Sequence, residues 1–398
     1  MKQCVVLVGG KGTRLGDVTV NFPKPLLSIN SKPFLEYLLS YIERYGFKEV
    51  LLLAGHANIE IIKFANNYKN SSLNVEVIVE KTPLGTGGSL INAYEKLDDI
   101  FFMLNGDSLL DGNWLSIISD LKEDINISMA LTEVSDSGRY GAVKLSKKTV
   151  VSFEEKRKET KSIPGLINAG IYCVRKKILK DIGLKKISFE KDILPALVSE
   201  KKVAGKKIAG YFIDIGTQET LKEANLTQWL KNRKAVILDR DGTLNEDRGY
   251  TYKAEDLIWK PGAKEFIKNL NKRNYYVFVA TNQSGIARGK YSEDDMHKFH
   301  DKMQEELMKS GAYIDKFYYC PYHRDGIKLK YKKESNDRKP NTGMLEKITK
   351  EWSLNKKNLF FIGDSASDLE CANNFKIKAY KYNGKDDLMT IFKKNFFK

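Results

Sequence analysis

The stretch Ala235–Asn245, AVILDRDGTLN, limits what this chain can fold into more than any other. Its first four residues are apolar and predict a short buried strand. Asp239 and Asp241 follow, and because side chains alternate along an extended strand, we expect both carboxylates to face one small volume. Gly242 then lets the backbone turn sharply behind them.

Two acids in one volume either bind a cation or have their pKa values driven apart, and both outcomes suit phosphoryl transfer. An isolated Asp-x-Asp also fits an acidic turn, so partners elsewhere in the chain decide between the two interpretations. Val277–Ala280 predicts a strand that ends at Thr281, and Phe360–Gly363 predicts one that ends at Asp364. Lys339 precedes a proline and is a rigidly placed cation. These partners favour a catalytic site.

The order Asp-x-Asp, Thr, Lys, Asp resembles that of the haloacid dehalogenase-type phosphatases. Five segments are similar to the heptose bisphosphate phosphatases within that family: DRDGTLNEDRGY at 239–250, TNQSGIARG at 281–289, CPYH at 320–323, RKPNTGM at 338–344 and GDSASD at 363–368. Histidinol-phosphate phosphatases are close relatives, so the resemblance supports the reaction type better than the substrate.

This resemblance implies a role for each matching residue. Asp239 would attack phosphorus and become an aspartyl phosphate, while Asp241 would protonate the leaving oxygen and then activate water. Thr281 and Lys339 would hold the phosphoryl oxygens. The Mg²⁺ ligands would be Asp239, Asp364 and the backbone carbonyl of Asp241.

Further residues of the matching segments would contact the rest of the substrate or support the metal ligands. Asn282, Arg288 and Arg338 are candidates for binding the sugar and its second phosphate. Asp368 would support the metal ligands. His297 lies in a charged helical segment together with His300, and we expect both at the surface.

A zinc site is the point where the chain departs from these relatives, which often close one with an early Cys-x-His and a Cys-x-Cys just before Arg-Lys-Pro. Cys320 and His323 remain as candidate zinc ligands, but Ser335 and Asp337 replace the later pair. A site made of the cysteine, the histidine and the aspartate is the alternative, but because serine is a poor zinc ligand, we expect the zinc to be lost.

The first half of the chain opens with a strand, Met1–Val8, that runs into the loop GGKGTRL at 9–15. The backbone N–H groups of such a loop can surround a phosphate, and Arg14 can add a bidentate contact. The loop lacks the P-loop pattern, and by itself an ordinary glycine-rich turn fits as well. Lys24 lies between two prolines that fix the backbone around it.

Two carboxylates stand at the ends of predicted strands in this half. Asp107 follows the apolar run Phe101–Leu104, and Asp214 ends another such segment about a hundred residues later. Ligands bind at strand ends in alternating β/α folds, and two carboxylates can share one Mg²⁺ at a triphosphate.

Residues from about 1 to 225 resemble the sugar-1-phosphate nucleotidyltransferases. The motifs are GGKGTRL at 9–15, PKPLL at 23–27, PLGTGG at 83–88, NGD at 105–107, EEK at 154–156, NAG at 168–170 and DIGT at 214–217. The resemblance implies nucleotide binding by Gly9, Gly10, Gly12, Thr13, Arg14, Gly85 and Thr86, with Lys24 at the α-phosphate. It implies Mg²⁺ binding by Asp107 and Asp214, and sugar-phosphate binding by Glu155, Lys156 and Asn168.

The expected chemistry needs no protein nucleophile. The sugar phosphate oxygen would attack the α-phosphorus of the nucleotide and release pyrophosphate, while Mg²⁺, Lys24 and Arg14 neutralise charge. The PLGTGG motif is closer to guanylyltransferase relatives than to thymidylyltransferases, which favours GTP.

The fold class we expect is α/β, in two domains: a Rossmann-like nucleotidyltransferase with a mixed, mainly parallel sheet at residues 1–230, and a haloacid dehalogenase-like phosphatase with a minimal cap at 235–398. A chain of 398 residues is long enough for two cores. Residues 231–234 would be a short basic linker without the glycines of a flexible tether.

Composition indicates the compartment and the kinds of partner that we expect for the protein. No apolar run approaches the roughly 18 residues that span a bilayer, and Cys4–Val8 is too short for a signal peptide. Four scattered cysteines predict no disulfide framework, so we expect a cytoplasmic protein without a membrane partner. The net charge of +16 is spread along the chain as lysines, and we expect no nucleic-acid partner. A homo-oligomer is left open.

Together the two resemblances predict consecutive reactions on heptose phosphates with GTP. The phosphatase would remove the 7-phosphate of a heptose 1,7-bisphosphate, and the transferase would convert the 1-phosphate to GDP-D-glycero-α-D-manno-heptose. The alternatives are the same two reactions with another sugar phosphate or nucleotide, and a chain in which one domain serves only for binding or regulation.

Overall fold

A computed structural model describes residues 3–10, 12, 15, 22–68, 72–154, 163–224 and 233–396. The chain divides into two compact units, Met1–Leu226 and Thr227–Lys398. All four cysteines are free and buried. Across the described residues, the structure has no helix that combines the length and the apolar character needed to cross a membrane.

Within the described part of the first unit, nine strands form one mixed sheet in the order β5-β4-β1-β6-β11-β8-β12-β10-β9. Their bounds are β1 (Gln3–Leu7), β4 (Glu49–Ala54), β5 (Asn74–Val79), β6 (Ile100–Asn105), β8 (Ile127–Val134), β9 (Ala142–Ser146), β10 (Thr149–Glu154), β11 (Gly165–Arg175) and β12 (Val203–Lys207). Strands β5, β4, β1 and β6 run parallel, whereas β11 is antiparallel to β6 and to β8. The carboxyl ends of the four parallel strands therefore meet along one edge.

The described part of this unit also contains two short ladders and five α-helices. The ladders join β2 (Ser28–Ile29) to β3 (Lys32–Pro33) and β7 (Ser108–Asp111) to β13 (Tyr211–Asp214). The helices are α1 (Phe34–Arg44), α2 (Asn58–Asn67), α3 (Gly85–Asn92), α4 (Leu194–Ser199) and α5 (Gln218–Glu223). Leu90 of α3 and Leu194 of α4 share a core with Val5 and Met103 of the sheet.

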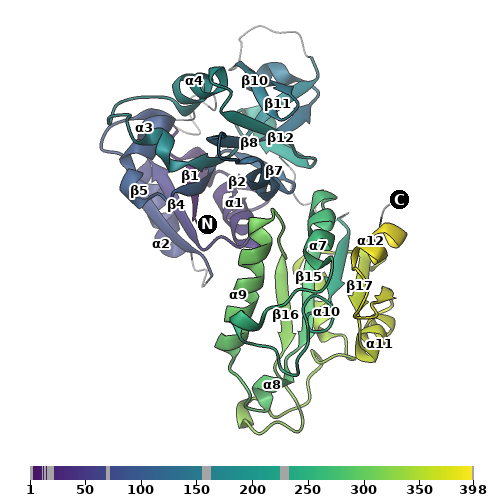
Figure 1. The fold of residues 1–398 in the computed structure, drawn as a ribbon. Helices are drawn as coiled ribbons and strands as arrows, with labels where there is room; N and C mark the ends of the chain where they lie inside the picture. Colours follow the sequence, from purple (N-terminus) through teal and green to yellow (C-terminus); the bar gives the residue numbers. More distant parts are fainter. Residues whose placement is uncertain are drawn as a thin grey trace. The chain divides into compact units, whose positions relative to one another are not determined.

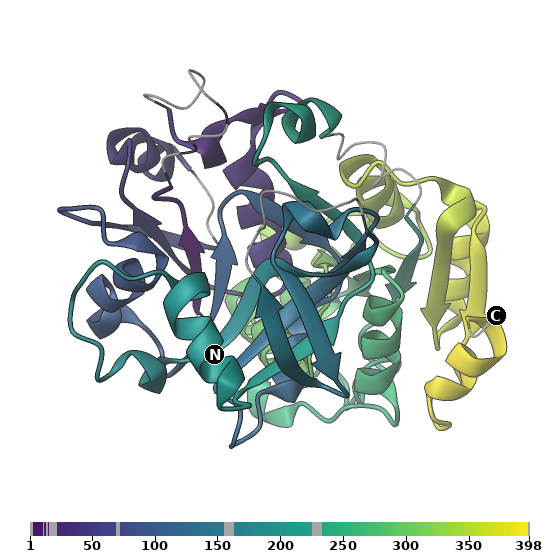
Figure 2. The same cartoon turned by 90° about the horizontal axis from the view of Figure 1, so that it is seen from above.

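The second unit contains a five-stranded parallel sheet with helices on both faces (Figures 1 and 2). Its strands, in the order β16-β15-β14-β17-β18, are β14 (Ala235–Leu238), β15 (Tyr276–Asn282), β16 (Lys316–Cys320), β17 (Leu359–Gly363) and β18 (Lys378–Lys381). The helices are α7 (Ala263–Lys272), α8 (Ser284–Ala287), α9 (Glu293–Lys309), α10 (Gly343–Glu351), α11 (Ala366–Phe375) and α12 (Met389–Asn395).

The side chains of β14 alternate between the two faces of the sheet, which explains why helices cover both faces. Val236 and Leu238 pack into a core with α7, α9 and α12, whereas Ala235 and Ile237 pack into a core with α10 and α11. A strand buried on both faces must be apolar throughout, as this one is. Because β14 is the central strand, the residue after Leu238 lies in the middle of the carboxyl edge of the sheet.

Candidate active sites

A cavity of about 950 Å³ opens at the carboxyl ends of β1, β4, β5 and β6 in the first unit. Seven residues predicted from the sequence line it: Gly9, Gly10, Gly12, Lys24, Gly85, Thr86 and Asp107. Thr13, Arg14, Glu155 and Lys156 lie outside the described residues. The cavity is large enough for a nucleotide, since ligand pockets usually span roughly 300–1,000 Å³.

Asp107 and Asp214 lie close together beside this cavity. The β7–β13 ladder pairs Asp214 with Ser108, and the Ser108 hydroxyl lies 3.3 Å from a carboxylate oxygen of each aspartate. Lys24 Nζ lies 2.5 Å from Asp107 Oδ2. The backbone N–H of Gly216 donates to Asp214 Oδ1 at 2.6 Å. Two carboxylates and a buried lysine thus converge where a divalent cation and a phosphate can bind together.

The glycines of PLGTGG form the first turn of α3, which begins at Gly85. The N–H groups of Gly87 and Gly88 both donate to the carbonyl of Ile187, at 3.0 and 3.1 Å. A Cβ atom at position 88 would lie 2.6 Å from the carbonyl oxygen of Lys185, so the close approach of this segment requires glycine.

The Thr86 hydroxyl adds to the contact between the first turn of α3 and the segment around Ile187. It donates to Glu190 at 2.7 Å and accepts from the N–H of Phe189 at 2.8 Å. Thr86 therefore anchors the cavity wall formed by Lys186 and Glu190.

Glu80 is a cavity residue that the sequence analysis missed. Its carboxylate accepts from the N–H of Leu84 at 2.5 Å and from the Ser89 hydroxyl at 3.1 Å, which fixes its orientation. A Cβ atom at Gly9 would lie 3.0 Å from the same carboxylate, and one at Gly55 would lie 2.6 Å from it. The available signal was an acid directly after the strand that precedes PLGTGG.

Asn168 does not line this cavity. Its side chain pairs with the Tyr172 hydroxyl at 2.5 Å and accepts from the N–H of Gly170 at 3.0 Å. The predicted contact with the sugar phosphate is not tested by these interactions.

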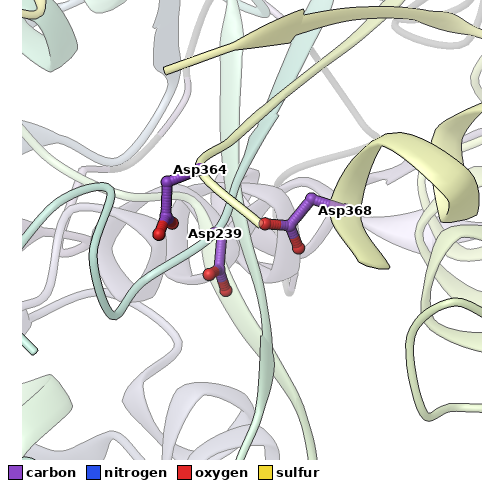
Figure 3. Close-up of side chains that lie close together, drawn as sticks. All are labelled: Asp239, Asp364 and Asp368. Atoms are coloured by element: carbon purple, nitrogen blue, oxygen red, sulfur yellow. The ribbon is translucent and has the colours of Figure 1, made fainter. Parts of the chain in front are cut away.

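The second unit gathers acidic residues at the carboxyl edge of its parallel sheet. Asp239 follows β14, Asp364 follows β17, and Asp368 lies in the first turn of α11. Each offers a carboxylate oxygen within 4.8 Å of the others, and Figure 3 shows the three side chains converging. No other such group of three potential ligands occurs within the described ranges of the chain.

Lys339 and Thr243 fix these carboxylates. Lys339 Nζ lies 2.6 Å from Asp239 and 2.6 Å from Asp368, and all three side chains are nearly inaccessible to solvent. The Thr243 hydroxyl donates to Asp364 at 2.8 Å. Thr281, at the end of β15, receives a hydrogen bond from Gln283 at 2.9 Å.

The electrostatics of the cluster favour a bound cation. Burial raises the pKa of Asp239 to about 7, and the charge of Lys339 opposes this rise. Burial also raises the pKa of Asp364. Burial alone would lower the pKa of Lys339, but Asp239 and Asp368 outweigh it and keep the ammonium charged. The cluster has more carboxylates than ammonium groups, and this excess of negative charge suits Mg²⁺.

Asp241 faces partners other than the carboxylate cluster. Arg240 holds its carboxylate through two N–H groups, at 3.0 and 2.7 Å, and Asn245 and Gln283 donate to it at 3.0 and 2.9 Å. Asp241 is not among the three clustered carboxylates, but its charge contributes to the raised pKa of Asp239, so the two aspartates remain neighbours. The role of the Asp241 backbone carbonyl as a metal ligand stays a prediction.

The backbone turns sharply at Gly242, as the sequence indicates. Its φ is +84°, and a Cβ atom there would lie 2.4 Å from Asp364 Oδ2. The absence of a side chain thus lets Asp364 approach the strand end.

The predicted substrate residues beside this cluster lie in two groups. The Asn282 side chain donates to the carbonyl of Lys339 and accepts from its N–H, both at 3.0 Å, so Asn282 fixes the position of the lysine. Arg288 Nη2 lies 3.2 Å from His323 Nε2. One guanidinium nitrogen of Arg338 is buried without a hydrogen-bond partner in the described part of the chain, which suits a site for an anion.

Of the four residues at the zinc-ligand positions, Cys320 lies close to Ser335 and Asp337, but no three His, Cys, Asp or Glu side chains gather there within the described part of the chain. The Cys320 thiol points to the carbonyl of Tyr322 at 3.9 Å, and Asp337 pairs with Lys347 at 2.5 Å. His323 faces Arg288 instead. The residues present therefore do not fit a zinc ion, and the expected loss of zinc stays a prediction.

His300 corrects the sequence analysis, which expected it at the surface. It is only 5% exposed, because it falls on the same face of α9 as the buried Met296, Phe299 and Met303. The charged residues around it in the sequence belong to the opposite face. His297 is exposed, as expected.

Comparison with protein families gives one match for each unit. The nucleotidyl transferase family model matches residues 3–229, and the polynucleotide kinase 3 phosphatase family model matches residues 234–391. The chain belongs to the nucleotidyl transferase family, with a phosphatase fused behind it. The two-domain α/β fold expected from the sequence is confirmed by these matches.

Individual relatives of this fused nucleotidyl transferase each match one half. A D-glycero-α-D-manno-heptose 1-phosphate guanylyltransferase of Campylobacter jejuni is 37% identical over 54% of this chain and 96% of its own. A D-glycero-α-D-manno-heptose-1,7-bisphosphate 7-phosphatase of the same organism is 45% identical over 36% of this chain and 78% of its own. A D-glycero-β-D-manno-heptose-1,7-bisphosphate 7-phosphatase of Rhodopseudomonas palustris is 42% identical over 40% and 89%.

Proposed function

We propose that this chain is a bifunctional enzyme that makes GDP-D-glycero-α-D-manno-heptose. The second unit would hydrolyse the 7-phosphate of heptose 1,7-bisphosphate, and the first would transfer GMP from GTP to the remaining 1-phosphate. The observation that carries the proposal is that each unit places acids and a buried lysine together at strand ends, in a chain whose halves resemble these two enzymes.

In the phosphatase reaction, a carboxylate oxygen of Asp239 forms a bond to phosphorus while the bond to the sugar oxygen breaks. Asp241 gives its proton to the leaving alcohol and then takes one from the water that attacks the aspartyl phosphate. Inorganic phosphate leaves and Asp239 is regenerated. Lys339 and Thr281 neutralise and orient the phosphoryl oxygens. Bound through Asp239, Asp364 and the Asp241 carbonyl, Mg²⁺ would screen the charge between nucleophile and phosphate.

In the transferase reaction, an oxygen of the sugar phosphate bonds to the α-phosphorus and pyrophosphate leaves, so no protein nucleophile is required. Lys24 is held rigidly beside the cavity, as a group that neutralises the α-phosphate must be. Mg²⁺ held by Asp107 and Asp214 would neutralise the triphosphate. Arg14, Glu155, Lys156 and Asn168 remain proposed contacts of the substrates.

Glu80 supports guanine as the base. A carboxylate fixed in the cavity wall can accept two hydrogen bonds from the N1–H and amino group of guanine. Thymine and uracil offer a single N–H flanked by carbonyl oxygens, which a carboxylate repels.

The α-anomer is proposed because the product of one reaction has to be the substrate of the other. The guanylyltransferase relative is named for the α-anomer, whereas the phosphatase relatives are named for both. The cytoplasmic location, the lack of nucleic-acid and membrane partners, and the state of assembly stay predictions.

Substrate panels test these assignments. The purified chain is incubated with Mg²⁺ and the α- and β-bisphosphates, and phosphate release is measured for each. GTP, ATP, CTP, UTP and TTP are then compared with heptose 1-phosphate and mannose 1-phosphate, by pyrophosphate release. Preference for another sugar or nucleotide would replace the substrate named here while keeping the reaction types.

A further inference from the structure

Arg240 is a fully buried cation next to the proposed proton-transfer residue Asp241. Its guanidinium donates to both oxygens of the Asp241 carboxylate and also to the carbonyl of Thr251, at 2.7 Å. The group lies over the ring of Phe299, at 4.7 Å from its centroid. A buried guanidinium is costly unless each donor is used, so its position is strongly determined.

His300 supplies a partner to the remaining end of the same guanidinium. Its Nε2 lies 3.1 Å from Arg240 Nη1, and its ring stacks on Phe317 of β16 with 4.3 Å between centroids. Burial, followed by the charge of Arg240, lowers the pKa of His300 well below its ordinary value. A neutral imidazole can accept a hydrogen bond at Nε2, which an imidazolium cannot.

Gln283 completes the arrangement from the other side of Asp241. It donates to Asp241 and to Thr281, both at 2.9 Å, and accepts from the Tyr291 hydroxyl. The Asp241 carboxylate is thus held by side chains that follow β14 and β15 and, through Arg240, by His300 of α9. A carboxylate on a strand end would otherwise be free to rotate about two side-chain bonds.

We propose that Arg240 and His300 are positioning residues that hold the Asp241 carboxylate in the orientation needed for proton transfer to the leaving oxygen and from water. The proposal rests on the proposed phosphatase function. His300 sets the guanidinium, and the guanidinium sets the plane of the carboxylate. Misplacing an acting group by about 1 Å can cost roughly a hundredfold in rate.

The test compares leaving groups. An alkyl phosphate expels a weakly acidic alcohol and needs a proton from Asp241, whereas p-nitrophenyl phosphate expels a stable anion and does not. The ratio of kcat/KM for heptose 1,7-bisphosphate to kcat/KM for p-nitrophenyl phosphate therefore measures the proton transfer. A loss of folded protein lowers both values equally and leaves the ratio unchanged.

Four variants are compared with the unaltered chain. Arg240→Met removes the guanidinium at similar volume. His300→Phe keeps the ring stack and removes the acceptor, while His300→Gln restores an acceptor. His297→Phe is the matched control, because His297 is an exposed residue of the same helix. Pyrophosphate release by the other half measures the amount of intact chain.

We expect the ratio to fall at least about tenfold in Arg240→Met and about threefold or more in His300→Phe. It should return to within about twofold of the original in His300→Gln and stay unchanged in His297→Phe. An unchanged ratio in Arg240→Met overturns the proposal. If that variant does not fold, an unchanged ratio in His300→Phe overturns it instead.

Results that contradict the proposed function differ from those that contradict this inference. If the chain hydrolyses another sugar phosphate in place of the bisphosphate, the substrate assignment is wrong and the ratio is taken with that sugar. If it hydrolyses neither the bisphosphate nor p-nitrophenyl phosphate, the phosphatase function and the inference both fall.

Discussion

At the scale of single residues, Asp239 has the most specific prediction. Asp239→Asn removes the proposed nucleophile and should lower phosphate release by about a thousandfold or more, since an amide cannot form the aspartyl phosphate. Pyrophosphate release should be unchanged. The measurement is kcat for both reactions on one preparation, with Asp294→Asn, an exposed position, as the control. Residual phosphate release near the original rate would assign the nucleophile elsewhere.

The raised pKa of Asp239 predicts a pH dependence of metal binding. A proton and Mg²⁺ compete for the same carboxylate. Because the pKa of Asp239 is about 7, the protonated fraction of this residue grows as the pH falls below that value. The apparent Kd for Mg²⁺ in the phosphatase unit should therefore be about tenfold weaker at pH 6 than at pH 8. Calorimetric titration of an Asp107→Asn variant isolates this site, and a Kd independent of pH would contradict the assignment.

Glu80 carries a prediction of nucleotide preference. Glu80→Gln replaces a two-acceptor group with one donor and one acceptor, so GTP should lose at least about tenfold in kcat/KM while TTP and UTP gain relative to it. Competition between GTP and TTP for heptose 1-phosphate, followed by product analysis, checks this. An unchanged ratio would mean that the base lies away from Glu80.

Among the structural elements, the turn after β14 has the strictest requirement. Gly242→Ala puts a side chain at φ +84°, which costs roughly 1–2 kcal/mol, and sets its Cβ against Asp364. We expect a lower Tm for the phosphatase unit and weaker Mg²⁺ binding. The control is Gly249→Ala, which also has positive φ but meets no atom within 4 Å. Equal losses in both variants would show that backbone strain alone matters.

The elements of the site were largely predictable, because the pattern of apolar strands ending in acids is local. Ala235–Leu238 forms a strand as predicted, and parallel neighbours bring Asp364 next to Asp239. Which way Asp241 turns was not predictable, because it depends on Arg240 and on the packing of α9. The same holds for His300, which lies 60 residues from its partner.

In the first unit, too, local motifs predicted some features and distant contacts determined the others. The cavity and its glycines followed from local motifs, whereas the helical start at Gly85 depends on the distant segment around Ile187. Glu80 was missed because a single acid after a strand carries no signal until the cavity is known. Sequence patterns thus locate strand ends, and tertiary packing decides which side chains meet there.

At the scale of the whole molecule, the two units should be separable in chemistry. Asp107→Asn should abolish pyrophosphate release while leaving phosphate release intact, the reverse of Asp239→Asn. An equal mixture of the two variants should restore complete conversion, because heptose 1-phosphate can diffuse between molecules. Failure of the mixture, with each single activity intact, would indicate that the intermediate has to pass within one chain.

The account rests on both reactions being carried out by one chain, and a single incubation tests this most directly. The purified protein is mixed with D-glycero-α-D-manno-heptose 1,7-bisphosphate, GTP and Mg²⁺, and the products are separated and weighed by mass spectrometry. We predict GDP-heptose with one phosphate and one pyrophosphate released per sugar. Bisphosphate and GTP recovered unchanged would contradict it.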